Sequence, residues 1–488
     1  MEVIYVVEKI EIQPLEITKA YMTYLFPFSF RVREHSKLIM QLEENHFQFF
    51  NLKKSELQDL YYGAGIKINH KELDQFFLPF IEDKLFPVST KERGFLRFSK
   101  EIKEHFQFEV NNNKLNFRVN SVDIILCPFG VGIVTIRTEM DETQETLTNV
   151  LDFMSHFRVL QPKLEEENGG RIVQNNKIFK TTSELVLDYL CKPLKPFIIH
   201  TKKMEGYYGS LPFFEDERML TSTFLIVAEN QTITKDQLYR IGQLDGKDSE
   251  GKEFMSSTNQ EYIERYIEKR VHDRWAPNTY TITSQHTQTT ISIKKRDQLN
   301  REISQFMSTH YYNLLLHYYY KIMFFKLSFE HSDVDWAKDK IFVEELIELI
   351  SKFDSGYYFN EVSSRTEGKE FTQILRDTFN INYLFEEVKR TVDDLFRAQE
   401  KQSYKRQNML LFMLTVYTVI SGIYGMNLAI EDWKGKTDWS KVSHYSFFEW
   451  ISLITALTGI ALSGILLAST GVKMIWEKYR KWKRRKFQ

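Results

Sequence analysis

The sequence is poor in the residues that cross-link a chain and in net charge. Its two cysteines, Cys127 and Cys191, lie far apart and outside any Cys-x-x-Cys spacing. This argues against both a disulfide framework and a zinc knuckle. The formal net charge is −1, so the chain lacks the basic footprint that nucleic-acid-binding proteins usually carry. We therefore expect no nucleic-acid partner.

Proline is missing from the last part of the chain, because all ten prolines lie at or before Pro277. Since proline interrupts helices, we expect a mixed α/β first part and long helices after it. Enzyme signatures are also missing. The stretch "GQLDGKD" has three residues between its glycines, whereas a phosphate loop has four, and no Ser or Thr follows Lys247. We predict that the chain is not an enzyme.

Several segments of the first part show strand or helix patterns. "VDIILCPFGVGIVTIRTEM" (122–140) contains two β-rich runs around Pro-Phe-Gly, which predicts a hairpin. The stretch that follows, "DETQETLTNVLDFMSHFRVL", has helical apolar spacing. "TYTITSQHTQTTISI" (279–293) predicts two more strands.

The second part is predicted to consist of long helices that lead into an apolar run. From Ile381 no Gly or Pro interrupts the helical pattern before Gly422. A helix over 381–427 would be roughly 70 Å long, too long for the interior of a compact domain. We interpret it as a stalk.

Two stretches lack charged side chains and are long enough to cross a bilayer. Met409 to Met426 spans 18 residues and Trp450 to Val472 spans 23. Lys and Arg cluster before the first run and after the second, whereas acids and bases balance between them. Because positive residues stay inside, we expect two spans in the plasma (inner) membrane, contacts with membrane lipid, and both termini in the cytoplasm.

The boundaries follow from these patterns. The sequence predicts a cytosolic α/β domain (1–294), a helical stalk region (295–407), a first transmembrane helix (408–427), an outer loop (428–446), a second transmembrane helix (447–472) and a basic cytoplasmic tail (473–488).

The first apolar run has one polar face that repeats every seven residues. Its members are Tyr404, Asn408, Leu411, Thr415, Thr418, Gly422 and Gly425. Small and hydroxyl residues of this kind join helix to helix. Polar groups in a membrane can equally line an aqueous pore built from several copies. The pattern alone leaves both interpretations open.

The end of this run, "GIYGMN", resembles the CorA family of magnesium channels and transporters, whose Gly-Met-Asn signature closes the first of two C-terminal spans. The resemblance covers about 380–488, and the preceding α/β part is compatible with that family. It implies a homopentamer in which Asn408, Leu411, Thr415, Thr418 and Gly422 line the pore. Gly425, Met426 and Asn427 would then form the selectivity filter.

The resemblance also implies a chemistry for the filter. The Asn427 carboxamide would accept hydrogen bonds from the water shell of Mg²⁺, which loses its water reluctantly. Glu431 and Asp432 would attract cations to the outer mouth. Stalk acids bind regulatory Mg²⁺ in the family, and Asp393 and Asp394 are the candidates here.

The large α/β part suggests a different function with the same pore. Some CorA-like proteins with enlarged cytosolic domains resemble effectors of type III CRISPR defence, opened by a nucleotide messenger made from S-adenosylmethionine and ATP. The leading expectation is a pentameric channel for Mg²⁺ or related divalent cations. The alternatives are such a messenger-gated effector, and a membrane-anchored sensor or enzyme in which the hairpin serves only as an anchor.

Overall fold

A computed structural model of the chain describes residues 12–54, 59–110, 113–140, 145–162, 170–175, 177–199, 218–332, 340–426 and 439–451, with scattered positions up to 472. These residues divide into two compact units. The first contains residues up to Asp333 together with Leu349–Val388, and the second contains Val334–Glu348 and everything from Lys389.

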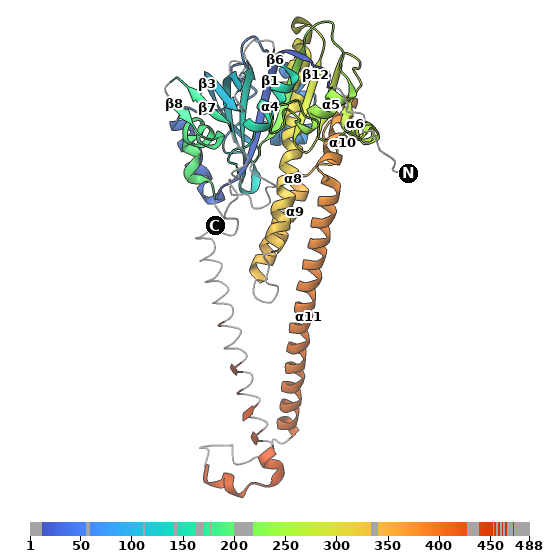
Figure 1. Ribbon diagram of the computed structural model, residues 1–488. Coiled ribbons are helices and arrows are strands. Elements are labelled where there is room, and N and C mark those ends of the chain that lie inside the picture. Colours follow the sequence, from blue (N-terminus) through green and yellow to red (C-terminus); the bar gives the residue numbers. More distant parts are fainter. Residues whose placement is uncertain are drawn as a thin grey trace, which may run out of the picture. The chain divides into compact units, whose positions relative to one another are not determined.

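The first unit is built on one sheet whose described strands number twelve (Figure 1). The strands are β1 (Glu16–Ser29), β2 (Gln48–Phe49), β3 (Leu96–Val110), β4 (Asn113–Leu126), β5 (Val131–Met140), β6 (Glu145–Thr146), β7 (Arg171–Gln174), β8 (Lys177–Phe179), β9 (Leu220–Val227), β10 (Val271–His272), β11 (Thr279–Thr283) and β12 (Thr287–Ser292).

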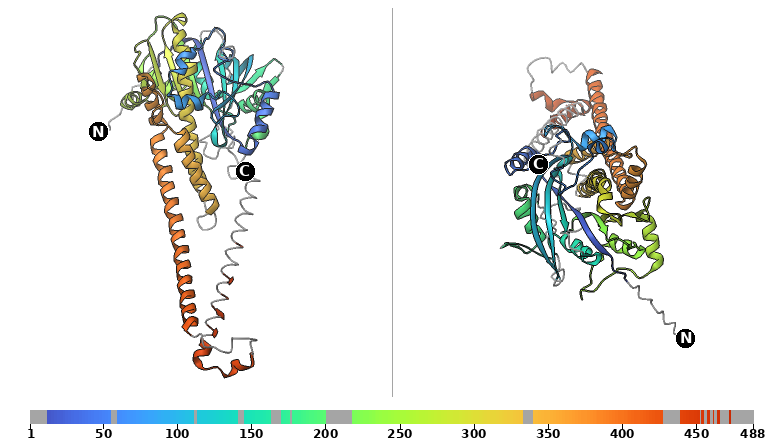
Figure 2. Two further views of the ribbon diagram at one scale, coloured as in Figure 1. Left: turned by 180° about the vertical axis from the view of Figure 1, so that it is seen from behind. Right: turned by 90° about the horizontal axis from the view of Figure 1, so that it is seen from above.

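The strand order is β10-β11-β12-β9-β1-β5-β4-β3-β7-β8, with β2 pairing with β3 and β6 with β1. β12 and β9 run parallel, and the other described pairs are antiparallel. The views in Figure 2 show the strands side by side in this sheet. Every residue of the central strand β5 is buried, so both faces of the sheet are covered there.

The described α-helices are α1 (His35–Glu44), α2 (His70–Asp74), α3 (Pro79–Leu85), α4 (Leu147–Phe157), α5 (Lys235–Gln243), α6 (Gln260–Arg270), α7 (Asn300–Gln305), α8 (Tyr311–Ser332), α9 (Lys340–Tyr357), α10 (Thr366–Thr378) and α11 (Ile381–Met426). A π-helical turn, Phe306–His310, joins α7 to α8. One long helix was predicted from residue 296, and this turn is where the structure departs from a regular helix.

Local sequence signals in the first unit are confirmed. β4 and β5 form the predicted antiparallel hairpin, and Gly130 adopts a φ of +74° in the turn between them. α4 lies within the predicted helix, and Thr146 caps it by accepting a hydrogen bond from the Asn149 amide. β11 and β12 are the two predicted strands and pair with each other.

One face of the sheet is covered by α4 through an aromatic core. The ring centroid of Phe153 lies 5.2 Å from those of Phe108 on β3 and Phe117 on β4. Thr223 on β9 points to the same face, because its hydroxyl lies 3.8 Å from the sulfur of Met154. Apolar burial of this kind is the ordinary way in which a helix is held on a sheet.

The predicted membrane organisation requires correction. Among the described residues, no helix is both long and apolar enough to cross a membrane. The first run, Met409 to Met426, is the end of α11, whose preceding turns carry charged side chains up to Arg406. The side chains of 420–426 and most of 447–472 lie outside the described residues. The predicted transmembrane helices, and with them the predicted inner-membrane location, are wrong for the described part of the chain.

The fold is therefore an α/β unit with a large mixed sheet, joined to a second unit that contains most of α11. That helix begins at the predicted residue, Ile381, and is 46 residues long. Its length, and not a membrane span, is what the uninterrupted pattern after Pro277 encodes in the described residues.

Candidate ligand site

A line of polar side chains crosses the sheet on the face opposite α4. Cross-strand pairing places one residue from each of six neighbouring strands in register. We call this line the polar row, and its members are Thr283, Gln288, Ser222, Thr23, Arg137 and Ser121. Each member is at most 3% exposed. Sheet interiors are normally apolar, so a fully polar, fully buried row needs an explanation.

The polar row faces the layer formed by α7, the π-helical turn and α8. Ser222 alternates with Thr223, which points to α4, so Ser222 points the other way. Arg137 lies with its guanidinium 4.8 Å from the ring centroid of Tyr311, the first residue of α8. Thr135, two residues before Arg137, shares a 2.9 Å hydrogen bond with the Tyr311 hydroxyl. π-helical turns occur frequently at functional sites.

A buried ion cluster lies at the β3–β4–β5 end of the polar row. Asp123 on β4 is completely buried between Arg97 on β3 and Arg137 on β5. Arg97 donates from Nη2 to Asp123 Oδ1 at 3.2 Å, and Arg137 donates from Nη1 to Oδ2. Burial alone would raise the pKa of Asp123, but the Arg137 and Arg97 guanidinium groups hold it below its usual value. The carboxylate is therefore ionised at neutral pH.

Tyrosines complete the surroundings of this cluster. Arg97 donates from Nη1 to the hydroxyls of Tyr62, at 2.9 Å, and Tyr312, at 2.8 Å. Burial raises the pKa of Tyr311 to about 12, so that hydroxyl stays neutral at physiological pH. The cluster thus contains two cations and one anion, with neutral phenols around them.

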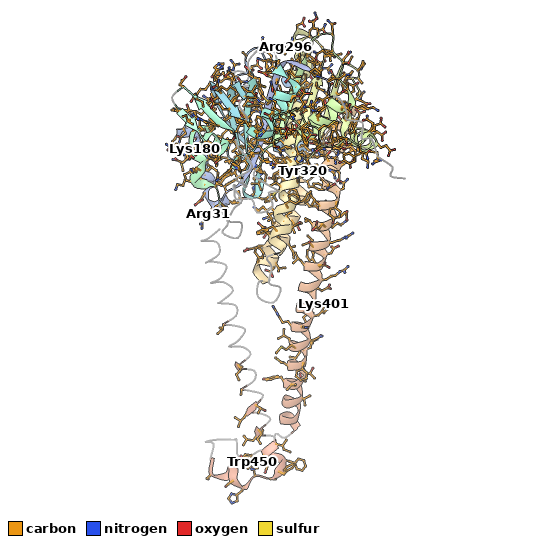
Figure 3. The ribbon with its side chains drawn as sticks, viewed as in Figure 1. Arg31, Lys180, Arg296, Tyr320, Lys401 and Trp450 are labelled. Atoms are coloured by element: carbon orange, nitrogen blue, oxygen red, sulfur yellow. The ribbon has the colours of Figure 1, made fainter. Side chains whose placement is uncertain are left out.

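The opposite end of the polar row adjoins α8 and α10. His317 Nδ1 lies 2.8 Å from the carbonyl oxygen of Asn313, which one helical turn brings within reach. Burial lowers the pKa of His317 to about 4, so the ring is neutral at pH 7. Tyr320, labelled in Figure 3, lies further along α8 and accepts a hydrogen bond from the Phe359 amide at 3.2 Å.

Unpartnered buried atoms concentrate along this layer. Most buried polar atoms in folded proteins have a hydrogen-bond partner, so a cluster of exceptions marks a place of interest. Within the described part of the chain, those that lie on the polar row or beside it are Thr283 Oγ1, Gln288 Oε1, Arg137 Nε and Nη2, Asn120 Nδ2, Asn313 Nδ2, His317 Nε2 and Thr378 Oγ1.

The predicted pore residues all belong to α11 or follow it, not to this layer. Asn408, Leu411, Thr415 and Thr418 are exposed on α11. Gly422, Gly425 and Met426 lie on the same helix, but their side-chain surroundings are not described. Asn427, Glu431 and Asp432 lie outside the described residues.

The predicted regulatory acids, Asp393 and Asp394, are exposed neighbours on α11. Among the described residues, no group of three or more His, Cys, Asp or Glu side chains is arranged to hold a metal ion. A regulatory site shared between copies of the chain, as the resemblance implies, stays a prediction.

Sequence reasoning missed the polar row altogether. Its members come from six strands that are scattered between Thr23 and Gln288, and only the register brings them into line. One signal was present in the sequence. The strands of "TYTITSQHTQTTISI" carry hydroxyl or amide residues on both faces, which is unusual for strands that become buried.

Comparison with known proteins adds no relative: no family model matches the chain, and neither a curated protein nor a solved structure is significantly similar to it.

Proposed function

We propose that the α/β unit binds a small, extended polar ligand along the polar row, and that the chain is a ligand-responsive effector. The observation that supports this is the set of buried, unpartnered polar atoms between the sheet and α8. An unpartnered buried polar group costs about 1–3 kcal/mol, so a row of them is retained only where something else benefits. A bound ligand that supplies the missing partners would provide that benefit.

The dimensions and chemistry of the polar row narrow the class of ligand. Six strands define five inter-strand spacings, which place the ends of the row about 24 Å apart. A ligand of that length with several donors and acceptors is larger than a single metabolite headgroup. A nucleotide second messenger, including a conjugate of S-adenosylmethionine and AMP, has this extended, polar character. It is the ligand that we propose.

A route from the polar row to α11 runs through Gln285. Its side-chain oxygen accepts a 3.0 Å hydrogen bond from Lys321 on α8, and its side-chain nitrogen donates to the carbonyl oxygen of Thr378. Thr378 is the last residue of α10, and α11 begins three residues later, at Ile381. A ligand that favours one arrangement of this contact would therefore change where α11 starts.

Calorimetric titration of the full-length chain tests the proposal. Nucleotides, dinucleotides and an S-adenosylmethionine–AMP conjugate would be titrated in turn, and Mg²⁺ would be titrated separately. Thr283→Val removes an unpartnered hydroxyl of the polar row and should weaken binding about five- to tenfold, the effect of one lost hydrogen bond. Thr223→Val removes a buried hydroxyl from the opposite face of the sheet and should leave the affinity unchanged.

The outcome would decide against the proposal in either of two cases. One is the absence of heat and of thermal stabilisation with every nucleotide. The other is equal weakening by Thr283→Val and Thr223→Val, which would place the ligand elsewhere. Strong Mg²⁺ binding without any nucleotide response would instead favour the divalent-cation function that the Gly-Met-Asn resemblance implies.

A further inference from the structure

We infer that Arg137, Asn120 and the turn Tyr61–Gly65 form a subsite for one anionic group, a phosphate or a carboxylate. This inference rests on the proposed function, because it assigns a chemical specificity to one end of the polar row. It is carried by three independent features: the charge balance of the ion cluster, the direction of its unpartnered atoms, and the backbone of the adjoining turn.

The ion cluster carries one positive charge more than it neutralises. Arg97 and Arg137 are 3% and 1% exposed, and both of them pair with the single carboxylate of Asp123. The next carboxylate on β5, Glu139, is engaged by Arg118 from β4. An uncompensated buried charge is strongly unfavourable unless a counter-charge or a set of hydrogen bonds stabilises it. An anion is the group that would restore the balance.

The unpartnered atoms beside this charge are all hydrogen-bond donors. They are Nε and Nη2 of Arg137 and Nδ2 of Asn120. Asn120 keeps its oxygen engaged, because Oδ1 accepts a 2.9 Å hydrogen bond from Arg118 Nε, and this fixes the amide nitrogen on the other side. A guanidinium edge and an amide donor match the acceptor oxygens of phosphate or carboxylate. They offer nothing to a cation.

The backbone brings these donors together. Arg137 pairs with Ser121 across β4 and β5, and Asn120 precedes Ser121 at an irregularity in the register. The turn Tyr61–Gly65 lies against both positions. The guanidinium of Arg137 is 5.1 Å from the ring centroid of Tyr62, and a Cβ on Gly63 would lie 2.9 Å from Asn120 Nδ2.

The turn itself has the form of a backbone that approaches a ligand closely. Gly63 and Gly65 have φ values of +109° and +73°, a region that residues with a Cβ rarely adopt. A Cβ on Gly65 would have no heavy atom within 4 Å, so packing does not explain this glycine. Ser121 anchors the turn by donating from its hydroxyl to the Tyr61 carbonyl at 2.6 Å.

A purely structural role is the competing explanation. The cluster would then hold α8 on the sheet through Tyr311 and Tyr312, and anions would have no specific effect. The two explanations differ in a measurable way, because only a subsite makes the stability of the folded chain depend on the concentration of an added anion.

The test uses thermal unfolding of the full-length chain at pH 7 and constant ionic strength. Inorganic phosphate, acetate and chloride are compared, so that the phosphate and carboxylate arms are separated from general salt effects. We expect phosphate or acetate to raise the unfolding midpoint in a saturable manner and chloride not to do so. Arg137→Gln should abolish the rise.

Asn120→Asp is the decisive variant, because it should fold even if Arg137→Gln does not. The substitution keeps the oxygen that Arg118 contacts and replaces the unpartnered donor with a negatively charged acceptor. We expect the apparent affinity for the anion to fall by about tenfold or more. Asn116→Asp, at an exposed position on the same strand, makes the same chemical change and should leave the anion response unchanged.

The result that would overturn the subsite is an equal anion response in Asn120→Asp and the wild-type chain, or no wild-type response beyond that to chloride. Nucleotide titration of the same variants separates this failure from failure of the proposed function. Nucleotide binding that Asn120→Asp does not weaken would leave the function standing and remove the subsite. A phosphate response without nucleotide binding would do the reverse.

Discussion

Replacing Asp123 by Asn should destabilise the α/β unit more than any other single carboxylate-to-amide change in the described part of the chain. Asp123 is completely buried and neutralises two guanidinium groups at once, from Arg97 and Arg137. Removal of one partner from a buried ion pair costs about 3–5 kcal/mol, because the remaining charge is left uncompensated. Since two charges lose their partner here, we expect the upper part of that range.

The assay is urea unfolding at pH 7, followed by circular dichroism, with the midpoint of the α/β unit's transition compared between variants. Glu264→Gln is the matched control. Glu264 pairs with Lys235 at 3.0 Å, but both side chains are about half exposed. Exposed pairs contribute about 0–1 kcal/mol, so this midpoint should barely move. An Asp123→Asn protein within about 1 kcal/mol of the wild type would refute the reasoning.

The same pair of proteins should differ in their response to acid. The pKa of Asp123 is lowered in the folded state, so its contribution to stability is present above the unfolded value of about 4. That contribution is lost as the pH falls from there through the folded-state pKa. The difference in unfolding free energy between the wild type and Asp123→Asn should therefore shrink below about pH 4. A difference that stays constant down to pH 2 would contradict the assigned ionisation.

Two further substitutions test other parts of the first unit. Gly246→Ala would place a Cβ 2.5 Å from the Asp152 backbone nitrogen. It should lower the free energy of unfolding by about 1–3 kcal/mol, measured by thermal unfolding, whereas Gly251→Ala, with open space around its Cβ, should cost less. Burial lowers the pKa of His317 to about 4, so the wild type should lose stability as the pH falls from about 6.5 towards 4. His317→Leu should lose less over that range, and identical pH profiles would show that His317 does not titrate with unfolding.

Much of the local structure could be predicted from the sequence, because its signals are local. Pro128 and Gly130 impose a turn between two β-rich runs, and Thr146 caps the helix that follows. The helix from Ile381 could be predicted because nothing in its sequence breaks it. In each case neighbouring residues carry enough information to decide the conformation.

The candidate site could not be predicted in this way, because it depends on register. Thr23 and Arg137 become neighbours only through the pairing of β1 with β5, and Gln288 reaches the same line through a parallel β12–β9 pair. A register shift of one residue would turn every one of these side chains to the opposite face. The sequence analysis was drawn instead to the uncharged runs after residue 408, since hydropathy is visible without any tertiary information.

The exposed apolar side chains of α11 lead to one more expectation. Leu410, Leu411, Phe412 and Leu414 are each more than half exposed. The hydroxyls of Thr415 and Thr418 donate to carbonyls of their own helix at 2.8 Å and need no outside partner. Apolar contact therefore decides what covers this helix, and exposed apolar patches of this kind mark association surfaces.

We expect the full-length chain to form a homo-oligomer through this surface, with five copies if the resemblance of the Gly-Met-Asn segment extends to assembly. Native mass spectrometry or sedimentation would count the copies directly. Leu411→Glu places a charge within the apolar surface and should shift the mass towards the monomer. Lys401→Glu changes the charge of an exposed residue ten positions earlier on the same helix, marked in Figure 3, and should not. A monomeric wild-type chain, or dissociation by both substitutions alike, would show that α11 is not the surface of assembly.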